Sequence, residues 1–216
     1  MKYNPEIHHR RSIRLPGYDY SQAGMYFVTI CTQNRECAFG KIVHGKMEPN
    51  ISGEIVTDEW KKTAEIRKQI TLDEWIVMPN HFHGIVGVNI GKSTARRAST
   101  VERFGHPVSG SIPTIVRSFK SAVTKRINEL NQTPGKKLWQ RNYWEHIVRS
   151  KSELDRIREY IRNNPVQWEL DRLHPDQPGW DGRGTARRAP TGIREPSVEY
   201  GQSKHPENLN GKVSMI

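Results

Sequence analysis

The stretch Trp75-Ile76-Val77-Met78-Pro79-Asn80-His81-Phe82-His83-Gly84-Ile85-Val86-Gly87-Val88 decides the fold of this chain. It is rich in β-forming residues on both sides of Pro79-Asn80, which predicts two buried strands joined at that dipeptide. Side chains alternate along a strand, so His81 and His83 share one face while Phe82 lies on the other. Two imidazoles side by side on a rigid strand are half of a metal site, although such a pair alone is more often structural.

Composition limits the classes of protein that fit this sequence. The chain has 216 residues, of which 34% are hydrophobic, and its formal net charge is +11. The low apolar content predicts one medium-sized domain that does not use the whole chain. The excess of positive charge favours a polyanionic partner, nucleic acid before an anionic membrane. No apolar run is as long as a membrane span and the N-terminus does not resemble a signal peptide, so we expect a cytoplasmic protein.

The two ends of the chain differ from its middle. Residues 1–20 are basic and lack periodicity, which fits either a disordered tail or an arm that binds a phosphate backbone through Arg10, Arg11 and Arg14. From residue 173 onward, and most clearly beyond Gln177, the chain is rich in proline, glycine and asparagine, so 173–216 is predicted to be a disordered tail. Residues 21–172 are then the folded domain.

Within that domain, periodicity predicts the remaining elements. Residues 25–32 are β-branched and aromatic and predict a strand, and 38–56 predict a small hairpin followed by a loop. Residues 57–69 predict a helix, and 90–112 predict a long flexible loop. The residues expected to face the core from the first helix and its end are Trp60, Ala64, Ile66 and Ile70.

A second helix is predicted over residues 113–130, followed by an unusually aromatic segment at 138–146. The apolar stripe of this helix consists of Ile115, Phe119, Ala122, Val123, Ile127 and Leu130. Arg117 and Lys120 line another face, which is either a solvated surface or a surface that contacts phosphates. The aromatic segment could stack on bases or could form an edge of the core.

The last predicted helix carries a tyrosine with a polar neighbour. Ser150 and Glu153 form a capping box at its start, and Pro165 is expected to end it by driving Asn164 out of the helical region. Tyr160 and Asn164 are spaced i, i+4 and so share a face. The amide oxygen of Asn164 suits a hard cation, although a helical tyrosine beside an apolar stripe is usually structural.

Three blocks, 78–86, 138–149 and 159–166, occur in the order found in a known family. Together they resemble the REP-associated tyrosine transposases, relatives of the single-tyrosine transposases with the His-hydrophobic-His (HUH) motif, and the resemblance covers about residues 10–170. It implies an α+β fold with a ferredoxin-like, or RRM-like, core whose central antiparallel sheet bears the histidines and has helices on one face.

The resemblance also implies the chemistry and the residues that perform it. Tyr160 would be the nucleophile, while His81, His83 and Asn164 would bind Mg²⁺ or Mn²⁺. A phenol is a poor nucleophile at neutral pH unless a cation assists it, which suits this pairing. The reaction would be nicking and joining through a 5′-phosphotyrosine. Tyr143 is the rival nucleophile, but no ligand lies one helical turn from it.

The implied partner is single-stranded or hairpin DNA of the REP type, bound by a bacterial, nucleoid-associated monomer or homodimer. The residues expected to contact DNA are Arg10, Arg11, Arg14, Arg117, Lys120, Lys125, Arg126, Gln140 and Arg141. Two other interpretations remain. One is a catalytically silent, RRM-like nucleic-acid-binding protein, and the other is a structural zinc protein, which the lack of cysteine partners disfavours.

Overall fold

A four-stranded antiparallel sheet organises the computed structural model, which describes residues 18–89 and 108–176. Its strands are β1 (Gly24–Cys31), β4 (Ile70–Met78), β5 (His81–Val88) and β6 (Trp144–Val148), in the order β4-β5-β1-β6. A separate two-stranded hairpin consists of β2 (Gly40–Val43) and β3 (Lys46–Pro49). The predicted arm with Arg10, Arg11 and Arg14, and the tail beyond residue 176, lie outside the described residues.

The order of the elements is that of a ferredoxin-like fold with additions. The helix α1 (Ile51–Glu65) connects β1 and the hairpin to β4, while α2 (Ile112–Asn131) connects β5 to β6. Strand, helix, two strands, helix and strand, with the first and third strands in the centre, form the ferredoxin-like pattern. The helix α3 (Lys151–Asn163) and two short 3₁₀ helices, η1 (Gln33–Arg35) and η2 (Trp168–Leu170), complete the described part. The expected α+β class with a central antiparallel sheet is confirmed.

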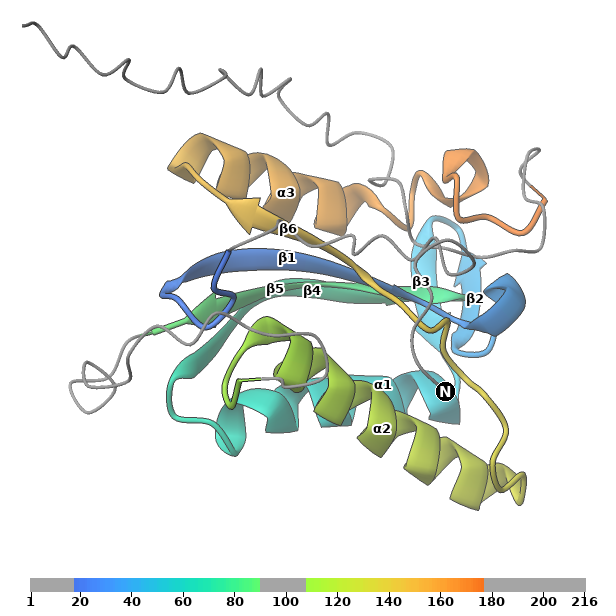
Figure 1. The fold of residues 1–216 in the computed structure, drawn as a ribbon. Helices are drawn as coiled ribbons and strands as arrows, with labels where there is room; N and C mark the ends of the chain where they lie inside the picture. The colour runs from blue at the N-terminus through green and yellow to red at the C-terminus, as the bar shows by residue number, and fades with distance from the viewer. Residues whose placement is uncertain (1–17, 90–107, 177–216) are drawn as a thin grey trace, which may run out of the picture.

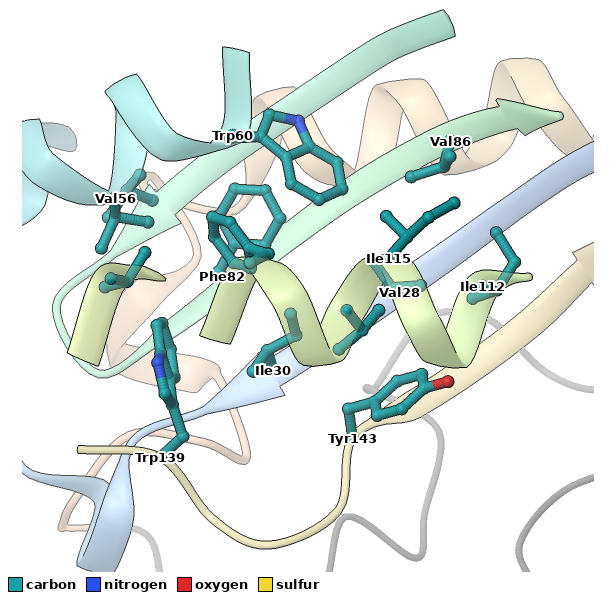
Figure 2. Packing of buried hydrophobic residues seen from close by; sticks show 14 of the residues in the cluster. Val28, Ile30, Val56, Trp60, Phe82, Val86, Ile112, Ile115, Trp139 and Tyr143 are labelled. Atoms are coloured by element: carbon teal, nitrogen blue, oxygen red, sulfur yellow. The ribbon is translucent and has the colours of Figure 1, made fainter. Parts of the chain in front are cut away.

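The main core lies between the sheet and the pair α1 and α2 (Figures 1 and 2). Trp60 of α1 packs on Phe82 of β5 with a ring-centroid distance of 4.6 Å, and Phe119 of α2 packs on both rings. Gly84 makes this contact possible, because a Cβ there would lie 2.7 Å from the Trp60 ring. Trp139 and Tyr143 of the aromatic segment are buried in the same core. That segment therefore forms an edge of the core, one of its two predicted roles.

Helix α3 lies on the opposite face of the sheet from α1 and α2 (Figure 1). Its buried residues Ile157 and Ile161 pack with Phe27, Ile85 and Trp144 in a second, smaller cluster. The expectation of helices on one face thus holds for α1 and α2, whereas α3 covers the other face. Because strand side chains alternate, this second face is the one that bears His81 and His83.

The first helix begins six residues earlier than the predicted start at residue 57. Asn50 caps it, since its side chain accepts a hydrogen bond from the backbone N–H of Gly53 at 3.0 Å. Gly53 favoured a loop in the sequence-based prediction, but in the structure it belongs to the helix. A glycine is required at this position because a Cβ would lie 2.3 Å from the carbonyl oxygen of Phe39. Ile66, which was expected in the core, follows the end of the helix and is 70% exposed. Leu130, also expected in the core, is 49% exposed at the end of α2.

The third helix starts as predicted, with the Ser150 side chain accepting a hydrogen bond from the Glu153 N–H. It ends at Asn163, but Asn164 keeps helical dihedral angles (φ −57°, ψ −41°), so the expected effect of Pro165 on that residue is wrong. The chain continues as turns into η2, with the N–H of Gln167 donating to the carbonyl of Asn163. This continuation keeps the residues after α3 close to the histidines. Among the described helices, none combines the length and apolarity needed to cross a membrane.

Candidate active site

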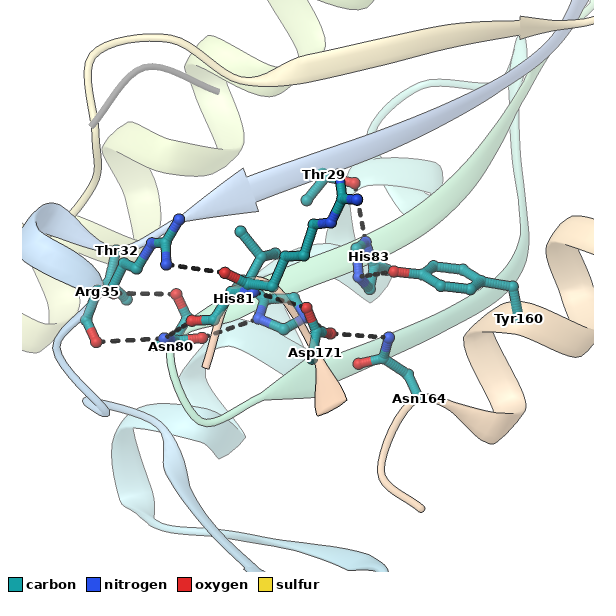
Figure 3. Close-up of polar contacts among 11 residues, drawn as sticks. Thr29, Thr32, Arg35, Asn80, His81, His83, Tyr160, Asn164 and Asp171 are labelled. Carbon is teal, nitrogen blue, oxygen red and sulfur yellow. Dashed lines mark hydrogen bonds and ion pairs between the residues drawn. The ribbon is translucent and has the colours of Figure 1, made fainter. Parts of the chain in front are cut away.

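The two histidines lie at the beginning of β5, on the face that α3 covers (Figure 3). Both side chains are fully buried, and their ring centroids are 4.6 Å apart in an edge-on arrangement. The neighbouring strand β1 pairs Cys31 with His81 and Thr29 with His83. The sheet therefore holds the two imidazoles side by side, as the alternation of the sequence predicted.

A hydrogen bond to the Nδ1 atom selects the tautomer of the His81 ring. The Nδ1 atom of His81 lies 2.8 Å from the side-chain oxygen of Asn80. The amide nitrogen of Asn80 donates to the carbonyls of Leu173 and Arg35, which fixes the amide so that its oxygen faces His81. That oxygen can only accept, so the proton of His81 resides on Nδ1. Its Nε2 atom is left with a free lone pair.

Both partners of His83 are hydroxyls, so its tautomer depends on which of them donates. The Tyr160 hydroxyl lies 3.3 Å from His83 Nε2, and Thr29 Oγ1 lies 2.8 Å from His83 Nδ1. When the phenol donates to Nε2, the ring proton resides on Nδ1 and is donated to Thr29. Both histidines then present an unprotonated Nε2, the form in which imidazole binds a metal. The structure thus brings together Tyr160, His81 and His83 as the sequence predicted.

Asn164, at the end of α3, and Asp171, which directly follows η2, close the site (Figure 3). The amide nitrogen of Asn164 donates to Asp171 Oδ2 at 3.3 Å, while its oxygen is buried without a hydrogen bond to any described residue. Asp171 Oδ2 is 3.9 Å from His81 Nε2, which also has no hydrogen-bond partner in the described part. Ligand atoms of His81, His83 and Asp171 all lie within 4.8 Å of one another. The group can therefore hold a metal ion.

Burial controls the protonation of the site. Desolvation lowers the pKa of His81 to about 4, against the opposing influence of Asp171, and it lowers the pKa of His83 as well. Both imidazoles are consequently neutral at pH 7, and the contact between His81 and Asp171 is not an ion pair. Desolvation, reinforced by the charge of Asp171, raises the pKa of Tyr160. The phenol is thus harder to ionise here than in water, and a nucleophilic Tyr160 needs a cation nearby.

Sequence reasoning missed Asp171 and Asn80. Asp171 lies at the edge of the predicted tail, in a stretch without periodicity, and the turns after α3 bring it back to the histidines. Hydrogen bonds hold this stretch: Leu173 N–H donates to Asp171 Oδ1 at 2.7 Å, Arg35 donates to the Arg172 carbonyl at 2.8 Å and Asn80 donates to the Leu173 carbonyl at 2.7 Å. Asn80 could have been identified from the sequence, since it directly precedes the histidines at the connection between the two strands.

The basic residues expected to contact DNA are placed away from the histidines. Arg126 of α2 is paired with Glu59 at 2.8 Å and with Asp58 at 3.4 Å, both on α1. Lys120 donates to the backbone carbonyls of Gln140 and Arg141 at 2.6 and 3.3 Å. The remaining described members are Arg117, Lys125 and Arg141, which are exposed, and Gln140, which is buried. Helix α2 covers the sheet face opposite the histidines, so its members Arg117, Lys120, Lys125 and Arg126 do not line the site itself.

Comparisons with known proteins match one segment of the chain to a family. The model of the family described as IS200-like transposases matches residues 104–164, which include α2, β6 and α3 with Tyr160 and Asn164. An uncharacterized protein of Haemophilus influenzae is 41% identical over 181 residues, covering 81% of this chain and 98% of that protein.

Two solved structures are similar at lower identity. A REP-associated tyrosine transposase bound to a REP hairpin is 21% identical, with a TM-score of 0.47 over 69% of this chain and 70% of that one. A candidate transposase from Deinococcus radiodurans is 19% identical, with a TM-score of 0.39 over 69% of this chain and 97% of that one. The match to the IS200-like transposases thus covers the segment of this chain that carries the tyrosine.

Proposed function

We propose that this transposase nicks and joins single-stranded DNA, with Tyr160 as the nucleophile and a divalent metal ion as cofactor. One observation carries the proposal: the Tyr160 hydroxyl lies 3.3 Å from His83 Nε2 in a buried group of potential metal ligands. The proposed nucleophile, Tyr160, therefore lies next to a proposed metal ligand, His83. The match of residues 104–164 to the IS200-like transposases supports DNA cleavage and joining as the reaction class.

The residues present fit a metal ion. His81 Nε2 and Asn164 Oδ1 are buried without hydrogen bonds to described residues, which is costly unless something else satisfies them. We assign His81, His83 and Asn164 as ligands, as expected from the sequence, and add the carboxylate of Asp171. Two imidazoles, an amide and a carboxylate suit Mn²⁺ or Mg²⁺ and lean toward Mn²⁺. When bound, the ion would polarise a non-bridging oxygen of the scissile phosphate.

The covalent step uses only the chain and the DNA. Tyr160 Oη attacks the phosphorus, the bond from phosphorus to the 3′ oxygen breaks, and the phenol proton is lost while the departing oxygen gains one. The products are a 5′-phosphotyrosine and a free 3′-hydroxyl. In the joining step a 3′-hydroxyl attacks the same phosphorus and Tyr160 leaves as a phenol. The energy of the phosphodiester is retained, so no nucleotide cofactor is needed.

The proposed substrate is a DNA hairpin of the REP type with a single-stranded flank. The three sequence blocks shared with REP-associated tyrosine transposases support this choice, and the net charge of +11 suits a polyanion. A DNA substrate of this kind places the protein in the bacterial cytoplasm, at the nucleoid.

The test uses labelled hairpin DNA, Mn²⁺ and a denaturing gel. Wild-type protein is expected to form a covalent adduct that Tyr160→Phe does not form. Tyr143→Phe is the matched control, because Tyr143 is buried in the core on the other face of the sheet. It should still form the adduct. Tight binding by wild-type protein without any cleavage would reject the proposal in favour of a catalytically silent nucleic-acid-binding protein.

A further inference from the structure

A groove on the α2 side of the molecule is lined by charged residues that are all positive. It has a volume of about 570 Å³ and lies between the C-terminal half of α2 and residues 135–141. The residues that line it are Lys120, Ser121, Thr124, Lys125, Asn128, Gly135, Lys136, Lys137, Leu138, Trp139, Gln140 and Arg141. Five of these carry a positive charge and none carries a negative one, although the chain has 23 acidic residues.

Lys120 holds a partly buried charge in the wall of this groove. Its ammonium donates to the carbonyls of Gln140 and Arg141 and has no salt bridge with any described carboxylate. Burial lowers the pKa of Lys120 to about 8, so the charge is retained at neutral pH at a cost in solvation. An anion in the groove would offset that cost.

The outer cationic side chains of the groove are accessible to a phosphate backbone. Lys136, Lys137 and Arg141 are exposed. The ion pairs of Lys136 with Glu36 at 3.8 Å and of Lys125 with Glu129 at 3.9 Å are long and exposed. Pairs of this kind contribute little free energy and are readily exchanged for another anion.

The groove lies within reach of the site. Residues 139–140 run beside the end of β1, because Trp139 bridges to Thr32 and the Gln140 N–H donates to the Cys31 carbonyl at 2.9 Å. Cys31 is in turn paired with His81 of β5. Two steps between neighbouring strands, about 10 Å in the plane of the sheet, separate the backbone of the groove wall from that of the first histidine, whose side chain lies on the other face of the sheet. A single strand that passes around the edge of the sheet at β6 can span that distance.

From this placement we propose that the groove between α2 and residues 135–141 binds the sugar-phosphate backbone of single-stranded DNA that flanks the nicked position. A positive groove that follows the backbone is the usual device for holding single strands without reading their sequence. The identity of the polyanion as DNA rests on the proposed function. The positive charge of the groove comes from its own residues and does not depend on Tyr160 or the histidines.

The test measures binding in a Tyr160→Phe background, so that catalysis plays no part. The groove variant is Lys136→Gln with Lys137→Gln. The control variant, Lys61→Gln with Lys68→Gln, removes the same charge from exposed lysines that do not line the groove. Each protein is titrated with a labelled hairpin that either carries or lacks a single-stranded flank, over a series of salt concentrations. Melting curves check that all variants remain folded.

The groove variant is expected to bind the flanked hairpin about tenfold more weakly than the control variant and to bind the bare hairpin equally well. The slope of log K against log salt should fall in magnitude by about 1.4 on the flanked hairpin, for two lost phosphate contacts on a single strand. Equal losses in both variants or equal losses on both DNAs would each overturn the proposal. Failure of the adduct assay alone would overturn the role of Tyr160 and leave the groove standing.

Discussion

Asn80 is the residue on which the metal-binding form of His81 depends. Its amide oxygen holds the Nδ1 proton of His81, and its amide nitrogen is held by the carbonyls of Leu173 and Arg35. We expect Asn80→Ala to weaken Mn²⁺ binding roughly 10- to 100-fold, the usual effect of removing a group that orients a metal ligand. Isothermal titration calorimetry with Mn²⁺ alone, without DNA, measures this effect.

Asn80→Asp is the matched control for that substitution. A carboxylate keeps an acceptor for His81 Nδ1 but gives up the donors to Leu173 and Arg35, so Mn²⁺ affinity should stay closer to wild type than in Asn80→Ala. If both variants bind Mn²⁺ as the wild type does, Asn80 has no role in orienting the ring. If both lose affinity equally, its role is to hold the segment at Leu173.

Single residues of the site could be predicted where their spacing in the sequence determines which face they share. The alternation of a strand placed His81 with His83, and the i, i+4 spacing of a helix placed Tyr160 with Asn164. Asp171 could not be found in this way. Its position depends on the turns that follow Asn164, and no periodic pattern encodes the path of such turns. Contact between His83 and Tyr160, 77 residues apart, follows only from the packing of α3 on the sheet.

At the scale of elements, the docking of α3 decides where Tyr160 lies. Arg158 forms a bidentate ion pair with Asp73 of β4 at 2.8 and 2.6 Å, and Arg162 pairs with the neighbouring Glu74. We expect Asp73→Asn to lower Tm by about 1–3 °C at pH 7, as suits a partly exposed pair in a chain of this size, and to slow adduct formation. Asp155→Asn is the control, because Asp155 binds the same arginine from within α3. It should have little effect on the adduct.

The pH dependence of this pair has a definite sign. The hydrogen bonds from Arg158 hold the pKa of Asp73 below its ordinary value of 3.8. The pair therefore contributes its full stability above pH 3.8 and loses it as the pH falls through the lower pKa of the folded state. The difference in Tm between wild type and Asp73→Asn should shrink on acidification from pH 5 to pH 2.5, as measured by differential scanning fluorimetry. A difference that does not change with pH would contradict this account.

The presence of helices and strands was easier to predict from the sequence than their boundaries or the face of the sheet that each helix covers. Strands β1, β4 and β5 followed from runs of β-branched and aromatic residues, and the cap of α3 from Ser150 and Glu153, whereas β6 was not predicted as a strand. The start of α1 was missed because Gly53 indicates a loop by composition, while its actual cause is the close approach of the Phe39 carbonyl. The face chosen by α3 is a tertiary property, since its stripe of Ile157 and Ile161 would fit either side of a sheet.

For the whole molecule, the question is whether one chain forms a complete site. Tyr160 approaches His83 of its own chain, and α3 is anchored to its own β4 by the pair of Arg158 and Asp73. A mixture of two inactive variants, Tyr160→Phe and His83→Ala, should therefore form no adduct, because neither chain has both groups. In a protein whose helix is exchanged between subunits, the same mixture would regain activity, since one of the two shared sites would combine an intact tyrosine with an intact histidine.

The mixing experiment is decisive only if chains can meet and exchange. The two variants are unfolded and refolded together at equal concentration, then given the labelled hairpin with Mn²⁺, and the adduct is quantified on a denaturing gel. Wild-type protein refolded with Tyr160→Phe is the positive control, and its adduct should fall in proportion to the wild-type fraction. Adduct in the mixture of variants would show that α3 works on a neighbouring chain, which would require the contact between Arg158 and Asp73 to form between subunits. Its absence, with an active control, leaves the monomer as the smallest catalytic unit.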